Sequence, residues 1–102
     1  MTFPHFIRQY RVPWPYLIDE DIIIKMPVES EPLSVFVSPS SGGVYVTYVV
    51  DPDGEPRDRI IRIAAHNSDT RVHGYPAGRR FIGTVVFNGY VFHFFDYGWV
   101  LR

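Results

Sequence analysis

The sequence contains no cysteine, and this absence removes several kinds of site. Without thiols the chain has no disulfide, no cysteine-ligated metal centre and no cysteine nucleophile, and an intracellular setting is the default expectation. Long apolar runs are also absent, since no stretch approaches the roughly 18–20 residues that span a bilayer. Residues 1–6 lack the basic region and the apolar core of a signal peptide. We therefore expect a soluble protein with no membrane partner.

A large net charge is missing as well. Ten Lys and Arg residues oppose eleven Asp and Glu residues, which gives a net charge of −1 and argues against nucleic acid as a partner. The charges are unevenly spread along the chain. Residues 1–56 hold three basic and eight acidic side chains, whereas residues 57–102 hold seven and three. The second half therefore forms a basic patch only if its arginines cluster in space.

The sequence is rich in aromatic residues, at 17%, and these favour strands. Segments of β-branched and aromatic residues recur about every ten positions with turn signals between them. In a chain of 102 residues this pattern predicts an all-β single domain, an antiparallel sandwich or small barrel of six to seven strands that spans residues 1–102. The expected strands are 6–12, 21–26, 33–37, 44–50, 59–65, 81–87 and 90–95. Residues 29–32 are expected to form a loop, and residues 97–101 either extend the last strand or pack over an open face.

The clearest local signal is Asn88-Gly89 between two apolar runs, which predicts a β-hairpin with a two-residue turn. Such a turn fixes the register of the two strands. The pairs expected on one face are Phe87–Tyr90, Val85–Phe92 and Gly83–Phe94. Those expected on the other face are Val86–Val91, Thr84–His93 and Ile82–Phe95. We expect the Phe94 ring to lie across Gly83.

Both faces of this hairpin carry large apolar side chains. One face must be core, and the other needs cover either from the rest of the domain or from a partner chain. If a second molecule supplies the cover, we expect it to bury Ile82, Val86, Val91 and Phe95 of this chain. Oligomerisation of the chain is then expected.

Several short segments together resemble a family of small proteins encoded mainly by bacteriophages, in particular those of actinobacteria, with no assigned function. The matching segments are Tyr10-Arg11-Val12-Pro13, Ile24-Lys25-Met26-Pro27, Leu33-Ser34-Val35, Val49-Val50-Asp51-Pro52-Asp53, Arg62-Ile63, Phe81-Ile82-Gly83-Thr84 and His93-Phe94-Phe95-Asp96. The chain departs from the family pattern after Ile63, where Ala64-Ala65 stands in place of an expected Thr-Gly pair. The resemblance implies a viral origin and a small β fold, and it supplies no catalytic or binding residues.

The segment 67–80 breaks the strand rhythm and is the best candidate for a ligand site. Arginine forks, an aromatic ring and permissive glycines suit a phosphate, a nucleotide or an acidic peptide. The candidate residues are Arg71, His73, Tyr75, Arg79 and Arg80. The alternative is a solvated basic loop that keeps the sheet edge soluble.

Aromatic residues near both ends of the domain form a second candidate, a protein interface. Trp14, Tyr16, Tyr97 and Trp99 are of the type that anchors protein contacts. They are equally consistent with lids over the core.

Catalytic and metal-binding patterns are weak. His66, Asp69 and His73 offer imidazole and carboxylate groups, but their spacing matches no structural zinc pattern and favours polar loop residues. His93 is better explained as a strand histidine bonded to Thr84 than as a general base. No serine occupies a nucleophile elbow, and no glycine-rich segment forms a phosphate loop. We therefore expect neither an enzyme nor a cofactor.

Together these patterns indicate a non-catalytic binding or assembly module, a phage accessory protein that acts through contacts with itself or with a host or viral protein. It is expected in the host cytoplasm or in the virion. The alternatives left open are a virion structural component and a small-anion or nucleotide binder that uses residues 71–80.

Overall fold

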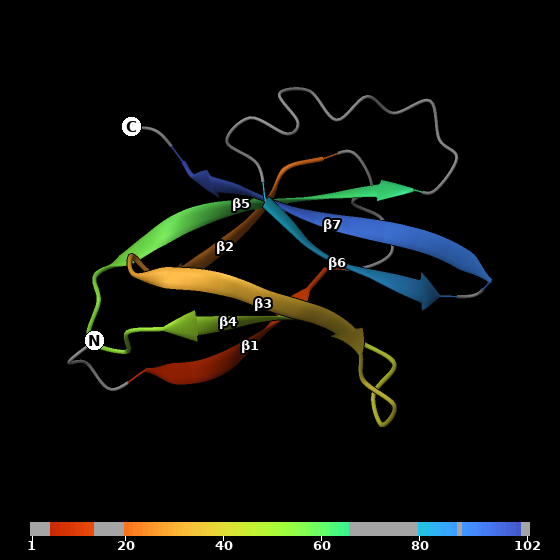
Figure 1. Ribbon diagram of the computed structural model, residues 1–102, viewed down its shortest axis with the longest axis horizontal. Helices are drawn as coiled ribbons and strands as arrows, with labels where there is room; N and C mark the ends of the chain where they lie inside the picture. Colours follow the sequence, from red (N-terminus) through yellow and green to blue (C-terminus); the bar gives the residue numbers. More distant parts are fainter. Residues whose placement is uncertain (1–4, 14–19, 66–79, 88, 101–102) are drawn as a thin grey trace.

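The computed structural model describes residues 5–13, 20–65, 80–87 and 89–100. These residues form seven strands and no helix (Figure 1). The strands are β1 (Phe6–Val12), β2 (Ile22–Pro27), β3 (Ser30–Val37), β4 (Val44–Val50), β5 (Pro56–Ala65), β6 (Arg80–Phe87) and β7 (Tyr90–Trp99). Within these ranges there is accordingly no helix that could cross a membrane.

The strands build two antiparallel sheets that pack as a sandwich. The three-stranded sheet has the order β1-β4-β3, and the four-stranded sheet has the order β2-β5-β7-β6. The edge strands β3 and β6 pack against each other, which brings one side of the two sheets together (Figure 1). The all-β prediction is therefore confirmed, as a sandwich rather than a closed barrel.

Alternation of side chains along the central strands produces the core. In β4 the side chains of Val44, Val46, Tyr48 and Val50 are buried, and those between them are partly exposed. β5 repeats the pattern with Ile61 and Ile63 pointing inward. The buried apolar side chains are Val12, Ile22, Met26, Val44, Val46, Tyr48, Val50, Ile61, Ile63, Ile82, Val85, Phe92 and Phe94.

The prediction of a loop at residues 29–32 is wrong, because β3 already begins at Ser30. Pro32 is tolerated inside this strand since β3 lies at the edge of its sheet, where a missing N–H breaks no ladder. A β-bulge between Pro32 and Ser34 then displaces Leu33. Leu33 is exposed, whereas Val35 and Val37 pack against the core, although simple alternation along residues 33–37 would place all three on one face.

The predicted hairpin is present, with Gly89 at a φ of 81°. Five of its six predicted pairs are confirmed, from Phe87–Tyr90 to Gly83–Phe94. The predicted Ile82–Phe95 pair is wrong, because a bulge between Phe81 and Gly83 makes Phe81 the partner of Phe95. The extra residue turns Ile82 toward the core.

Gly83 lies against the opposite sheet, at β3. A Cβ atom added at Gly83 would lie 2.8 Å from Cγ1 of Val35 on β3. The space above this glycine is therefore taken by Val35, a contact that the expectation of a covering Phe94 ring did not include. The missing side chain lets β3 and β6 approach closely.

Substitution Gly83→Ala is expected to lower the free energy of unfolding by about 1–3 kcal/mol, because the new methyl group overlaps a branched side chain that has one preferred rotamer. In a Val35→Ala background the same substitution should cost almost nothing. Urea denaturation of the two single variants and the double variant measures this coupling. An equal cost of Gly83→Ala in both backgrounds would show that Val35 is not the obstacle.

Candidate functional site

A buried ion pair lies between the two sheets. Arg59 on β5 and Asp96 on β7 both point inward and are only 6% and 2% exposed. Arg59 Nε donates a hydrogen bond to Asp96 Oδ2 over 2.7 Å, and the Tyr48 hydroxyl donates to the same oxygen over 2.8 Å. The backbone N–H of Gly98 donates to Oδ1 over 2.7 Å. Both oxygens of this carboxylate are therefore hydrogen-bonded.

The guanidinium of Arg59 makes further contacts that join the sheets. Its Nη1 donates to the carbonyl oxygen and to the hydroxyl of Ser30 on β3, over 2.9 and 2.7 Å. It also lies over the rings of Tyr48 and Trp99, 5.2 and 4.4 Å from their centroids. Ser30 and Tyr48 belong to the three-stranded sheet and the other partners to the four-stranded sheet. The network thus connects the two sheets by polar contacts through an otherwise apolar core.

The backbone bends after Asp96 and brings an N–H group to the carboxylate. A bulge displaces Tyr97 from the β5–β7 ladder, and Gly98 adopts a φ of 87°, which suits a residue without a side chain. This bend turns the N–H of Gly98 back onto the carboxylate two residues earlier. The segment Asp96-Tyr97-Gly98 therefore supplies both the carboxylate of the network and one of the groups that donate hydrogen bonds to it.

Burial raises the pKa of the Tyr48 hydroxyl far above its ordinary value, and the adjacent negative charge of Asp96 and the hydrogen bond to it raise it further. A neutral phenol that donates into a carboxylate is neither a base nor a nucleophile. Through Tyr48 and Ser30 this network joins the two sheets.

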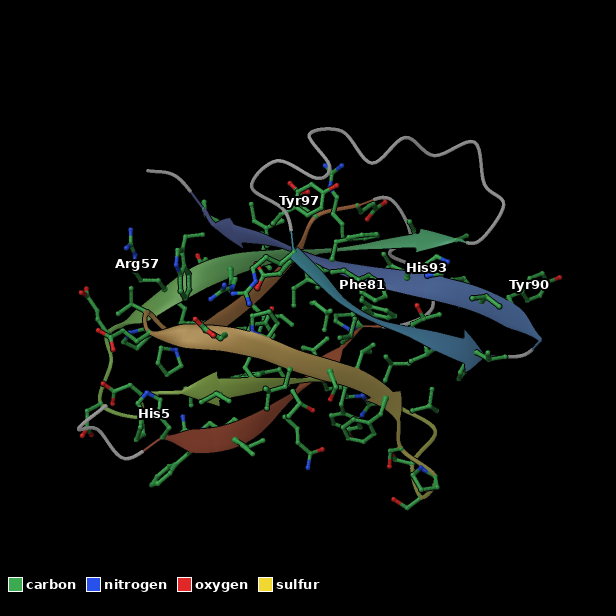
Figure 2. All side chains as sticks on the ribbon, in the orientation of Figure 1. His5, Arg57, Phe81, Tyr90, His93 and Tyr97 are labelled. Carbon is green, nitrogen blue, oxygen red and sulfur yellow. The ribbon has the colours of Figure 1, made fainter. Side chains whose placement is uncertain are left out.

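The outer face of the four-stranded sheet is divided into two halves. Over β6 and β7 it carries no charged side chain, and we call this half the hairpin face. Its residues are Phe81, Thr84, Val86, Val91, His93 and Phe95. Phe81 is 53% exposed and Val86 is 65% exposed, which makes this an open apolar surface. Figure 2 labels Phe81 and His93, which lie near each other on β6 and β7.

The aromatic rings of the hairpin face are held by one another. Phe81 meets Phe95 edge to face at 5.7 Å between ring centroids, and the imidazole of His93 at 6.4 Å. Thr84 Oγ1 lies 2.9 Å from His93 Nδ1, so the predicted contact between these two residues is confirmed. Because the rings already support each other, little side-chain freedom is left to lose on binding.

The half of this outer face over β2 and β5 carries two ion pairs, with the exposed Ile23 between them. Arg62 Nε donates to Asp21 Oδ1 over 2.6 Å while its guanidinium lies 5.2 Å from the centroid of the Tyr97 ring. The hydrogen bond that Arg62 donates to Asp21 raises the pKa of Arg62. Lys25 and Asp58 form a second, looser pair at 3.6 Å. An apolar surface with a polar margin is the usual anatomy of a protein interface.

The structure separates the predicted interface residues. Val86, Val91 and Phe95 lie on the hairpin face, whereas Ile82 is 7% exposed and belongs to the core. Tyr97 lies beside Arg62 at the polar margin, and Trp99 packs against the core and Arg59. Trp14 and Tyr16 fall outside the described residues.

Of the predicted anion site, only Arg80 lies within the described part of the chain. It is exposed at the start of β6, opposite Asp96, and its charge lowers the pKa of Tyr48 slightly against the other effects. The remaining candidates lie outside the described residues: Arg71, His73, Tyr75 and Arg79, with His66 and Asp69 of the weighed metal set. Among the residues that are described, no group of three or more His, Asp or Glu side chains is placed to hold a metal ion.

Sequence reasoning missed the buried ion pair and a depression on the other sheet. Arg59 could have been found, since it continues the inward series of Ile61 and Ile63. The depression encloses about 590 Å³ on the outer side of the three-stranded sheet. Its lining residues are His5, Val28, Glu29, Ser30, Glu31, Leu33 and Val49. Only the pairing of β1, β4 and β3 brings these residues together.

Substitution Asp96→Asn is expected to lower the free energy of unfolding by about 3–5 kcal/mol, because it leaves the buried charge of Arg59 uncompensated and turns an amide N–H₂ toward a donor. The matched control is Asp21→Asn, which removes the same type of arginine contact at a site that is 48% exposed. There we expect a loss of no more than about 1 kcal/mol. Urea denaturation gives both values, and equal losses would contradict a burial-dependent role.

Alkaline pH is expected to destabilise the fold through Tyr48. Its pKa is raised in the folded state, so above about pH 10 the unfolded chain loses the phenolic proton while the folded chain keeps it. The stabilisation is therefore complete below about pH 10 and falls above it, by up to about 1.4 kcal/mol per pH unit. Urea denaturation between about pH 9 and 11 should show this slope in the wild type. The variant Tyr48→Phe should show a slope that is shallower by one proton, and identical slopes would contradict the assignment.

Comparison with known proteins places the chain in a family. No curated protein and no solved structure matches it. The family described as Domain of unknown function (DUF7352) matches residues 5–98, a range that runs from the residue before β1 to Gly98 of β7. The chain therefore belongs to the DUF7352 family.

Proposed function

We propose that this protein is a non-catalytic binding and assembly module that acts through protein–protein contacts made by the hairpin face. The observation that carries the proposal is the absence of charged side chains on this face together with the exposure of Phe81 and Val86. Single exposed apolar residues are ordinary on protein surfaces, but a contiguous uncharged patch marks an interaction site.

The chemistry of the face defines its partner. Two phenyl rings in edge-to-face contact and two valines call for an apolar surface at the centre of the contact. The polar margin of the hairpin face carries charges of both signs, in the pairs Arg62–Asp21 and Lys25–Asp58. We therefore expect a partner protein with an apolar patch bordered by polar side chains.

The resemblance of the sequence to actinobacteriophage proteins supports a viral setting for this contact. In that setting the protein is a phage accessory protein that engages a host or phage protein in the host cytoplasm. A structural role in the virion is the alternative, and in that case the partner is a particle component. The same face serves both roles, because a binding surface does not depend on where its partner is assembled.

The experiment starts from the protein as its natural source produces it. Native mass spectrometry of the purified protein identifies the associated protein and the stoichiometry, and calorimetry with the two purified proteins gives the affinity. Substitutions Phe81→Glu and Val86→Glu place a charge in the apolar contact and are expected to weaken binding by about 100-fold or more. Leu33→Glu is the matched control, since Leu33 is 49% exposed on the other sheet.

Each alternative has its own outcome. Sedimentation of the protein with particles from the same source would assign it to the virion. Undiminished affinity of the Phe81→Glu and Val86→Glu variants would remove the hairpin face as the docking surface. A protein isolated without any associated chain would overturn the proposal as a whole.

A further inference from the structure

The edge strand β1 is unusually open. It pairs on one side with β4 over all seven of its residues, and in the sheet order it has no neighbour on its other side. Figure 1 shows it in red along the lower margin of the sandwich. Phe6 is 50% exposed and Ile7 is 68% exposed, and Arg8, Gln9 and Arg11 are exposed as well. A row of backbone N–H and C=O groups therefore faces outward beside exposed side chains.

The other edge strands carry features that discourage pairing. β3 contains Pro32 and a bulge, β6 contains a bulge beside Gly83, and these two edges pack against each other. β2 carries Lys25 on its outer face and ends at Pro27. β1 contains no proline, glycine, lysine or bulge. It is thus the edge best suited to accept another strand.

We propose that β1 pairs antiparallel with β1 of a second copy of this chain, with Gln9 opposite Gln9. This proposal is separate from the docking surface on the hairpin face. A strand that pairs with its own copy has only one antiparallel register in which all seven residues find a partner, and that register is centred on Gln9. The two three-stranded sheets then become one sheet of six strands.

The register is also favourable in charge. It places Arg8 opposite Tyr10 and Arg11 opposite Ile7, so no arginine faces an arginine. Shifting the centre by one residue to Arg8 would place the two Arg8 side chains opposite each other, which is unfavourable. An arginine opposite a tyrosine ring gains a cation–π contact in each half of the dimer.

On the outer face of the three-stranded sheet, this register places Arg11 of each copy beside Ile7 of the other. Ile7 shares a row with Val49 and Glu31, but Glu31 lies two strands farther from the contact. The contact is therefore one between the aliphatic part of the Arg11 side chain and the exposed Ile7 side chain.

The inner side of β1 leaves room for the second copy. Phe6 and Arg8 lie on the same side as Tyr10 and Val12, yet both are exposed. The four-stranded sheet therefore does not extend over the first half of β1. In the paired register Phe6 lies opposite Val12 of the second copy; Val12 is already buried in its own chain, so the adjoining β1 strand itself covers part of the half-exposed Phe6 ring.

The test measures the dimer constant of the full chain by analytical ultracentrifugation and exploits the sign of the charge at position 7. The substitution Ile7→Lys faces Arg11 of the second copy and is expected to weaken the dimer about tenfold, because the contact occurs twice. Ile7→Glu is expected to tighten it several-fold, and the double variant Ile7→Lys with Arg11→Glu should restore wild-type association. Ile7 is exposed, so thermal unfolding of these variants should stay close to that of the wild type.

Cysteine cross-linking tests the register directly, because the chain has no cysteine of its own. Residues opposite each other in an antiparallel pair have Cα atoms about 4.5–5.5 Å apart, within the range of a disulfide. The variant Gln9→Cys should therefore form a disulfide-linked dimer under mild oxidation. The matched variant Arg11→Cys should not, since its two cysteines would stand several residues apart along the strands.

Three results would overturn the proposal: a wild-type chain that stays monomeric at high micromolar concentration, equal effects of Ile7→Lys and Ile7→Glu, or a dimer that Gln9→Cys fails to cross-link. Dimerisation that is lost in Phe81→Glu and kept in Ile7→Lys would assign the contact to the hairpin face instead. A β1 dimer that is isolated without any other associated protein would count against the proposed function alone.

Discussion

The carboxylate of Asp96 is the constraint on which the arrangement of the two sheets depends. A buried charge is tolerated only where it is paired and hydrogen-bonded, and here Tyr48, Arg59 and Gly98 all donate to it. One donor comes from the opposite sheet, and Arg59 reaches across to that sheet through Ser30. Apolar side chains alone would tolerate small shifts between the sheets, but this set of bonds is satisfied in only one alignment. The ion pair therefore gives the sandwich its specificity more than its stability.

The second constraint lies where β3 crosses β6. Val35 occupies the volume that any side chain at position 83 would need, and the bulge beside it turns Ile82 inward and leaves Phe81 on the surface. One irregularity therefore closes the sandwich and at the same time builds the aromatic part of the hairpin face. This explains why the surface proposed to bind a partner adjoins the tightest contact between the sheets.

The two proposed contacts lie on different sheets and do not compete. The hairpin face belongs to the four-stranded sheet, whereas β1 is an edge of the three-stranded sheet. A dimer joined through β1 would present two hairpin faces on one rigid particle. If the partner also carries repeated sites, this geometry raises the effective concentration for the second contact and strengthens a weak single interaction. Such an arrangement suits an assembly module better than a carrier of a small ligand.

The sequence by itself determined the strands and most of the hairpin. The run of β-branched and aromatic residues placed Val44 to Val50 in a strand, and Asn88-Gly89 set the pairing as far as Gly83, because these signals depend only on neighbours along the chain. Tertiary structure decided what depends on residues distant in sequence: the bulge at Ile82, the entry of Pro32 into an edge strand, and the meeting of Arg59 with Asp96 and Tyr48. The hairpin face follows the same division. Its apolar residues could be identified in the sequence. Which of them face solvent depends on the packing of Val35 onto Gly83 and on the bulge, which turns Ile82 into the core and leaves Phe81 exposed.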